Sequence, residues 1–257
     1  MKSDIKIIVT DLDKTLIRTD MTISQYSLNV FNKCKKEGIL IALATARSEE
    51  QAKRYIELIK PDIVISNGGS LAKYVGKTIC KSMLSVEISN QIIKDCIDDS
   101  NFGDVVVQTE KEYYSNGKNF DKYGIDFSHA QFNDYAYPLK SMTHKISVEI
   151  FDQNSAKELA SKYTDCDFIG FSGENWYRFA HKDATKMKAI DKLTKYLKIG
   201  LKQVVAFGDD YSDMQMLKDC YGIAVANAIK EVQAIAACVT KNNDEDGVAD
   251  FIDRNIL

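Results

Sequence analysis

The fold is decided by the stretch Ile7-Ile8-Val9-Thr10-Asp11-Leu12-Asp13-Lys14-Thr15-Leu16. It opens with apolar or β-branched residues in a continuous run, which is typical of a strand buried on both faces of a parallel sheet. Because ligands bind beyond the carboxyl ends of strands in an open α/β sheet, Asp11 and Asp13 are expected at the mouth of a site. Adjacent carboxylates usually share a cation or a proton. The alternative is a strand end with two solvated aspartates.

The pattern of strand followed by helix recurs near both ends of the chain. Strands are predicted at 39–44, 63–65, 203–207 and 223–225, and amphipathic helices at 24–37, from 48 to near 61, and from near 183 to 197. Ser48 and Gln51 form a capping box for the second of these helices. Strands and helices that alternate with short links predict an α/β fold with a Rossmann-like, doubly wound parallel sheet.

The middle of the chain breaks this alternation. A hairpin is predicted at 71–83 with Gly76 at its turn, and strands follow at 105–107, 146–150, 168–171 and 176–179. Aromatic residues concentrate in this block, and a short helix is predicted from Ser155. We therefore expect an inserted α+β domain with its own sheet. The predicted division is a core formed by 1–83 and 180–257, with the insert at 84–179.

Length, composition and charge narrow the functional classes. The 257 residues suffice for one large or two medium domains, and 45% hydrophobic with 28% charged residues is ordinary for a globular protein. The net charge of −3 gives no broad electrostatic reason to bind nucleic acid or an anionic membrane. An anionic substrate would therefore need a locally positive pocket.

The cysteines and the apolar segments indicate the cellular compartment. The six cysteines form no C-x-x-C pair and have no histidine at ligand spacing. The N-terminus lacks the pattern of a secretory signal, and no apolar run approaches the roughly 20 residues that span a bilayer. We expect a reduced, soluble, cytoplasmic protein that binds neither nucleic acid nor membrane.

Four short segments fall where the carboxyl edge of the sheet would gather them. They are Asp11-Leu12-Asp13-Lys14-Thr15, Thr45-Ala46-Arg47, Lys186, and Gly208-Asp209-Asp210-Tyr211-Ser212-Asp213. In this order, and with the insert before the lysine, they resemble the haloacid dehalogenase-like phosphohydrolases of the Cof-type subfamily IIB, which carry a large C2-type cap. The resemblance covers the whole chain, including Asn67-Gly68-Gly69 and Asn227-Ala228.

The chemistry of phosphate esters explains these residue types. A phosphate dianion is repelled by a carboxylate nucleophile, by about 4 kcal/mol for each pair of unit charges at roughly 4 Å and an effective dielectric of about 20. A divalent cation and a lysine offset this repulsion and stabilise the charge of the transition state. Mg²⁺ prefers oxygen ligands, and the sequence offers no cluster of the softer ligands that zinc prefers.

The resemblance implies a role for each acidic residue. Asp11 would be the nucleophile that forms an aspartyl-phosphate, and it would also bind Mg²⁺. Asp13 would protonate the leaving alcohol and then activate water, with its backbone carbonyl on the metal. Asp209 would be the third protein ligand. Thr15, Asp210 and Asp213 would lie around these ligands, and Asp210 would be the weaker candidate for direct contact with the metal.

The resemblance also implies which residues bind phosphate: Thr45, Ala46, Lys186 and Asn227. Other interpretations remain open for several of them. Thr45 and Asn227 could be caps, Arg47 and Tyr211 are expected to be structural, and Lys186 alone would read as a solvated lysine.

Three positions depart from the family pattern. Lys14 stands where glycine is usual, so the backbone turn is less free and a positive charge lies near the pocket. Ala46 replaces another glycine, and Ser212 replaces an asparagine before Asp213. The carboxylates and the lysine are all retained.

The predicted function is Mg²⁺-dependent hydrolysis of small phosphate monoesters, such as sugar phosphates or phosphorylated cofactors. A non-catalytic sensor of phosphorylated ligands and a phosphomutase are the alternatives. Selectivity is expected in 116–132 and 173–181, whose candidates are Tyr123, His129, Asn175, Trp176, Arg178 and His181, although most of the aromatics could form the insert's own core. The expected partner is a small phosphorylated metabolite, and the expected state is a monomer or weak homodimer.

Overall fold

The computed structural model describes residues 4–97, 99–117 and 130–257, and its contacts divide the chain into two compact units. The first unit comprises Met1–Lys81 and Thr185–Leu257, and the second comprises Ser82–Ala184. The sequence placed the second boundary after residue 179. That position lies inside a strand of the second unit, Trp176–His181, so the unit continues to Ala184.

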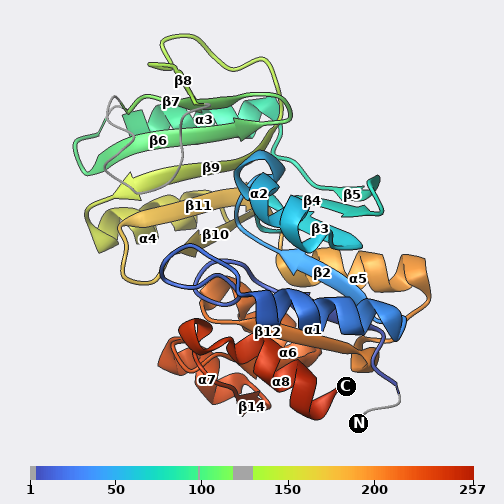
Figure 1. Ribbon diagram of the computed structural model, residues 1–257. Coiled ribbons are helices and arrows are strands. Elements are labelled where there is room, and N and C mark those ends of the chain that lie inside the picture. Colours follow the sequence, from blue (N-terminus) through green and yellow to red (C-terminus); the bar gives the residue numbers. More distant parts are fainter. Residues whose placement is uncertain (1–3, 98, 118–129) are drawn as a thin grey trace. The chain divides into compact units, whose positions relative to one another are not determined.

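The first unit is built on one sheet with the strand order β14-β13-β12-β1-β2-β3-β4-β5 (Figure 1). Its strands are β1 (Ile7–Thr10), β2 (Leu40–Ala44), β3 (Ile63–Ser66), β4 (Leu71–Tyr74), β5 (Lys77–Lys81), β12 (Val204–Gly208), β13 (Tyr221–Ala224) and β14 (Cys238–Val239). Neighbours from β14 to β3 pair in parallel, while β4 and β5 form an antiparallel hairpin at the edge. The predicted doubly wound α/β class is confirmed.

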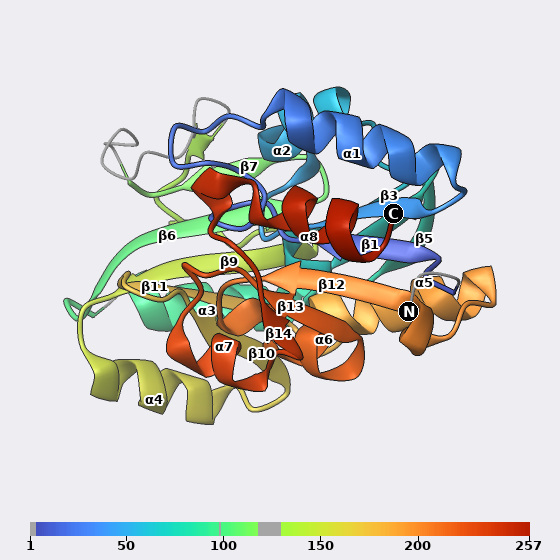
Figure 2. The same cartoon turned by 60° about the horizontal axis from the view of Figure 1, so that its bottom comes forward.

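Helices cover both faces of this sheet (Figure 2). They are α1 (Gln25–Lys36), α2 (Glu49–Ile59), α5 (Lys186–Leu197), α6 (Met214–Asp219), α7 (Lys230–Ile235) and α8 (Gly247–Asn255), with the short 3₁₀ turns η1 (Asn67–Gly69), η3 (Leu201–Gln203), η4 (Tyr211–Asp213) and η5 (Asn243–Glu245). Helices α1 and α8 pack together on one face, and α5 and α6 pack together on the other.

Local sequence sets the helix ends. Ser24 and Ser48 are the N-caps of α1 and α2, and the predicted capping box of Ser48 and Gln51 is present. Each capping side chain accepts a bond from a backbone N–H that would otherwise have no partner in the helix. After α1, Gly38 takes φ = 76°, a left-handed conformation that stops a helix without steric cost.

The second unit has its own sheet, in the order β10-β11-β9-β6-β7-β8. Its elements are α3 (Val86–Ile97), β6 (Phe102–Thr109), β7 (Tyr113–Ser115), β8 (Gln131–Phe132), β9 (Thr143–Ile150), α4 (Gln153–Lys162), β10 (Cys166–Gly170) and β11 (Trp176–His181). The pairs from β10 to β7 are antiparallel, and β7 and β8 are parallel. The helix predicted from Ser155 begins earlier: Asp152 caps α4, and Ser155 donates its N–H and its hydroxyl to the Asp152 carboxylate from inside the helix.

Each unit has a separate apolar core. In the first unit the fully buried Ile8, Ile41, Val204 and Phe207 come from the central strands. In the second unit α3 supplies Ile92 against Val105, Ile146 and Phe179 of the sheet. Over the stretches that the structure describes, no helix combines the length and the apolar character needed to cross a bilayer.

Candidate active site

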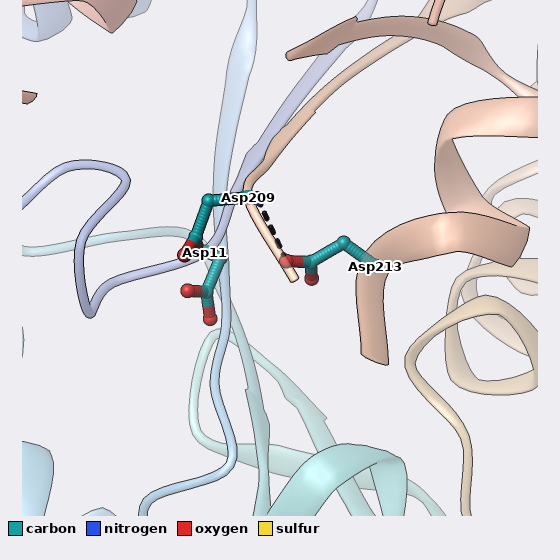
Figure 3. Close-up of side chains that lie close together, drawn as sticks. All are labelled: Asp11, Asp209 and Asp213. Atoms are coloured by element: carbon teal, nitrogen blue, oxygen red, sulfur yellow. Dashed lines mark hydrogen bonds between the residues drawn. The ribbon is translucent and has the colours of Figure 1, made fainter. Parts of the chain in front are cut away.

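The register of two neighbouring strands brings Asp11 and Asp209 together. In the parallel pair β1 and β12, Thr10 lies opposite Phe207, and the N–H of Asp11 donates to the Phe207 carbonyl at 3.1 Å. Asp11 follows the last residue of β1 and Asp209 follows the last residue of β12. Since parallel strands end at the same edge of a sheet, both carboxylates emerge side by side there (Figure 3). Both side chains are buried.

Asp213 joins them from the turn η4. One of its carboxylate oxygens accepts hydrogen bonds from the backbone N–H groups of Asp209, at 3.0 Å, and Asp210, at 3.2 Å. Glycine at position 208 makes this packing possible, because a Cβ there would lie 2.4 Å from the Cβ of Asp213. The bond from the Asp209 N–H to Asp213 is visible in Figure 3. Asp213 thus fixes the backbone that carries Asp209.

Lys186 supplies the positive charge of this cluster. Its Nζ donates to the carboxylates of Asp11, at 2.6 Å, and Asp213, at 2.7 Å, and only 2% of the residue is exposed. Lys186 is the first residue of α5, where a cation alone would oppose the helix dipole. The chain reaches this position because Gly69 packs against Thr185 and Lys186; a Cβ on Gly69 would lie 2.2 Å from the Thr185 carbonyl.

The three carboxylates form a compact, negatively charged group. One oxygen from each of Asp11, Asp209 and Asp213 lies within 4.8 Å of the others. Burial raises the pKa of Asp11 well above its ordinary value, against the opposing effect of Lys186. Burial and the nearby Asp213 raise the pKa of Asp209 to about 7. One lysine therefore does not neutralise the group, and a further cation would be stabilised there.

The donor set fits Mg²⁺. Asp11 and Asp209 offer hard carboxylate oxygens, which this ion prefers. Both oxygens of Asp213 already accept hydrogen bonds from the protein, so Asp213 is better suited to orient its neighbours than to bind the ion directly. Thr15, predicted near the ligands, donates its hydroxyl to Asp209 Oδ1 at 2.6 Å. Thr15 thus bonds to one of the two carboxylate oxygens of Asp209 and not to the other.

Asp13 lies apart from the three-carboxylate group. Its carboxylate accepts two bonds from the guanidinium of Arg47, at 2.9 Å from Nε and 2.5 Å from a terminal nitrogen. The Asp13 side chain is 42% exposed, so it remains accessible from solvent. Arg47 had been expected to be structural. Its position follows from strand register, because β2 runs parallel to β1 and ends beside it. The sequence around Arg47 does not indicate which carboxylate it binds.

The residues expected to bind phosphate are distributed around this edge. Thr45 is buried directly after β2, its hydroxyl accepts from the Arg47 N–H at 3.1 Å, and Ala46 follows it. Asn227 bonds to the protein's own backbone: its amide nitrogen donates to the Lys14 carbonyl at 2.6 Å, and its oxygen accepts from the Asn243 N–H at 3.0 Å. Asp210 caps the following turn by accepting from the Tyr211 N–H.

The selectivity candidates of the second unit differ in their surroundings. Tyr123 and His129 lie outside the described residues. Trp176, Arg178 and His181 belong to the strand β11, which extends the strand predicted at 176–179. Arg178 is buried in an ion pair with Asp167, and Nδ1 of His181 accepts from the Asp183 N–H at 3.1 Å. The sequence alone does not distinguish a side chain that bonds within the protein from one that contacts a ligand.

The chain belongs to the haloacid dehalogenase-like hydrolase family, whose model matches residues 8–252. It is 24% identical over 271 residues to the 5-amino-6-(5-phospho-D-ribitylamino)uracil phosphatase YitU of Bacillus subtilis, with 96% of each chain covered. The family predicted from the motifs is confirmed.

Solved structures share the same fold. A haloacid dehalogenase-like hydrolase from B. subtilis superimposes with a TM-score of 0.86 at 20% identity, covering 98% of this chain and 100% of the other. The subclass IIB sugar phosphatase BT4131 gives a TM-score of 0.81 at 21% identity, covering 96% and 98%. Family membership and the named relatives together support a phosphatase activity on phosphate substrates.

Proposed function

We propose that the protein is a Mg²⁺-dependent phosphatase that hydrolyses small phosphate monoesters through an aspartyl-phosphate on Asp11. The observation that carries the proposal is the buried Lys186, whose ammonium contacts Asp11 and Asp213 while a third carboxylate, Asp209, lies beside them. A lysine with a purely structural role would need only one carboxylate to balance its charge. An excess of buried carboxylate at a strand edge instead suits a site that completes its charge with a cation and an anionic substrate.

Side chains of the protein carry out both steps of the proposed hydrolysis, which are the formation and the breakdown of the aspartyl-phosphate. In the first, a carboxylate oxygen of Asp11 forms a bond to phosphorus while the ester bond to the alcohol breaks, and Asp13 gives the leaving oxygen a proton. In the second, Asp13 takes a proton from water, whose oxygen attacks phosphorus and releases phosphate and the Asp11 carboxylate. Lys186 keeps Asp11 oriented and reduces its repulsion from the phosphate.

Asp11, Asp209 and the backbone carbonyl of Asp13 would hold Mg²⁺. When bound, the ion supplies positive charge that neutralises phosphoryl oxygens in the transition state. Thr15 would orient Asp209, and Thr45 would donate its hydroxyl to a phosphoryl oxygen. Asp210 and Asp213 would support the turn from outside the ligand set.

The substrate class is a small phosphorylated metabolite. A sugar phosphate or a phosphorylated heterocycle with a polyol chain agrees with both the sequence and the named activities of the relatives. A panel of such esters should therefore include 5-amino-6-(5-phospho-D-ribitylamino)uracil. We also propose that the protein acts in the cytoplasm as a monomer or weak homodimer.

The proposal is tested by measuring phosphate release with Mg²⁺ from this panel by the parent and by Asp11→Asn. The variant keeps the size of the side chain and an acceptor for Lys186 but removes the nucleophile, so kcat should fall by at least about 10³-fold. Asp250→Asn is the matched control, because Asp250 belongs to α8 and forms ion pairs with Lys241 and Arg254, which have no part in the proposed reaction.

Three results would contradict the proposal in different ways. Equal turnover by Asp11→Asn and the parent would exclude the aspartyl-phosphate. Thermal stabilisation by sugar phosphates without release would favour the sensor. Conversion of a phosphate ester into its isomer without release of inorganic phosphate would identify a phosphomutase.

A further inference from the structure

Lys14 adopts a backbone conformation that its residue type disfavours. Its φ is 56°, in the left-handed region, where every side chain with a Cβ is strained and glycine is not. Lys14 stands between two site residues, Asp13 and Thr15. A change of φ at Lys14 would move the hydroxyl of Thr15 away from Asp209, to which it donates at 2.6 Å. The strained turn at Lys14 therefore needs contacts from other residues to keep its conformation.

Two asparagines from distant parts of the sequence bind the backbone of the turn. The Asn227 amide donates to the carbonyl of Lys14 itself at 2.6 Å. The Asn227 oxygen accepts from the Asn243 N–H, and the Asn243 amide donates to the carbonyl of Ile17 at 2.9 Å. The segment 14–17 is therefore closed into a ring of side-chain and backbone contacts. Asn243 is 6% exposed, so its part of the ring is shielded from water.

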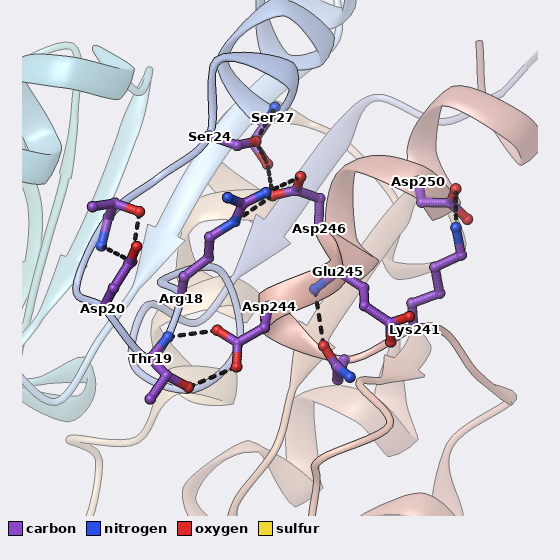
Figure 4. A network of polar contacts seen from close by, with 12 residues as sticks. Arg18, Thr19, Asp20, Ser24, Ser27, Lys241, Asp244, Glu245, Asp246 and Asp250 are labelled. Carbon is purple, nitrogen blue, oxygen red and sulfur yellow. Dashed lines mark hydrogen bonds and ion pairs between the residues drawn. The ribbon is translucent and has the colours of Figure 1, made fainter.

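A second group of contacts supports the ring from outside (Figure 4). Arg18 forms an ion pair with Asp246 at 2.5 Å. Thr19 donates to Asp244 through its N–H, at 2.7 Å, and through its hydroxyl, at 2.8 Å. Residues 17–19 are thus tied to the turn η5 and to Asp246, the residue that follows it. These contacts place Ile17 and Asn243 near each other but do not reach the Lys14 carbonyl.

We propose that Asn227, seated on Asn243, is a positioning residue that holds the left-handed turn at Lys14 and through it the Thr15–Asp209 contact and the placement of Asp13. This deepens the proposed function and rests on it wherever turnover is the readout. It differs from the expected role of Asn227 as a phosphate ligand, because one N–H and the oxygen of its amide already have protein partners.

The test compares the effect of Asn227→Ala in three backgrounds: the parent, Lys14→Gly and Lys198→Gly. In the parent, loss of the amide lets the turn relax, and kcat should fall about tenfold because the reacting groups are misplaced. In Lys14→Gly the left-handed turn has no strain to release, so the same substitution should cost less than about twofold. Lys198 is the matched control, with φ = 57° at the exposed end of α5.

Hydrogen exchange of the peptide that contains Leu16 and Ile17 gives a second readout that needs no turnover. Both N–H groups donate to the Leu12 carbonyl in the turn, at 3.0 and 2.8 Å. Asn227→Ala should accelerate their exchange in the parent and Lys198→Gly backgrounds and much less in Lys14→Gly. If the parent releases no phosphate, the proposed function fails, and exchange alone decides this inference.

An equal effect of Asn227→Ala in all three backgrounds would overturn the proposal, as would the absence of any effect in the parent. A rise in KM and in the inhibition constant of inorganic phosphate that Lys14→Gly does not reverse would restore the phosphate-ligand role.

Discussion

Arg47 holds Asp13 with both sides of its guanidinium. Nε donates to one carboxylate oxygen at 2.9 Å, and a terminal nitrogen donates to the other at 2.5 Å. The guanidinium carbon also lies 5.5 Å from the centre of the Tyr55 ring, and Tyr55 is buried. Arg47 is therefore fixed from two directions. A planar fork of this kind sets the orientation of a carboxylate, which a lysine cannot do in the same way.

Replacing this fork should impair proton transfer. We expect Arg47→Lys to lower kcat about tenfold for alkyl phosphates, whose leaving oxygen needs a proton from Asp13. The effect should be much smaller for p-nitrophenyl phosphate, because nitrophenolate leaves without one. Arg54→Lys is the control, since Arg54 also lies over Tyr55, at 4.4 Å, but bonds to Met21 and the Tyr55 hydroxyl. An equal loss with both substrates would exclude a role in protonating the leaving group.

Removing the buried lysine should affect both activity and stability. Lys186→Met leaves Asp11 and Asp213 without their cation, so kcat should fall by about 10³-fold and stability by about 3–5 kcal/mol. The loss of stability should be larger at about pH 8 than at about pH 5, because the raised pKa values of Asp11 and Asp209 let both carboxyls bind protons as the pH falls.

Urea unfolding at both pH values measures this difference. Lys195→Met provides the control, because Lys195 forms an exposed ion pair with Asp191 on the same helix. Its removal should change stability by less than about 1 kcal/mol. A loss for Lys186→Met that does not depend on pH would show that Asp11 and Asp209 do not titrate as described.

The stabilising effect of Mg²⁺ should increase with pH. The pKa of Asp209 is raised by folding from 3.8 to about 7, and that of Asp11 changes in the same direction. The folded chain then binds more protons than the unfolded chain, so this contribution to stability is present below about pH 4 and is lost as the pH rises through about 7. Mg²⁺ competes with those protons and restores stability where they have left.

Thermal melts with and without Mg²⁺ at about pH 5 and about pH 8 test this. The rise in Tm should be larger at the higher pH, and it should be absent in Asp209→Asn. A rise of the same size at both pH values, or one that persists in Asp209→Asn, would contradict Asp209 as a ligand. Activity that survives exhaustive chelation would exclude the metal requirement.

Substrate choice should follow the second unit. Exchanging residues 82–184 for the corresponding unit of a relative should keep phosphate release and change the order in which esters are preferred. The bounds follow the unit itself, since a cut at 179 would divide β11. In the proposed function the first unit supplies the groups that handle phosphate, so we expect the second unit to select the alcohol. An unchanged order of preference would place selectivity in the first unit.

The sequence by itself determined the fold class and the family. The period of apolar residues distinguishes buried strands from amphipathic helices, and the caps of α1 and α2 depend on residues only three positions apart. The candidate residues of the active site could also be predicted from the sequence. In parallel strands such as β1 and β12, residues that follow strand ends must meet at one edge, whatever the details of packing.

Only the tertiary structure decided which of these residues pair. Asp13 could bond to any neighbouring donor, and the choice of Arg47 depends on where β2 ends beside β1. The amide nitrogen of Asn227 bonds to the carbonyl of Lys14, and its oxygen bonds to the N–H of Asn243, sixteen positions further along the chain. Such contacts join residues far apart in the chain, so no local pattern encodes them. Their geometry is set by packing, and it separates the residues that touch the reacting atoms from those that hold them in place.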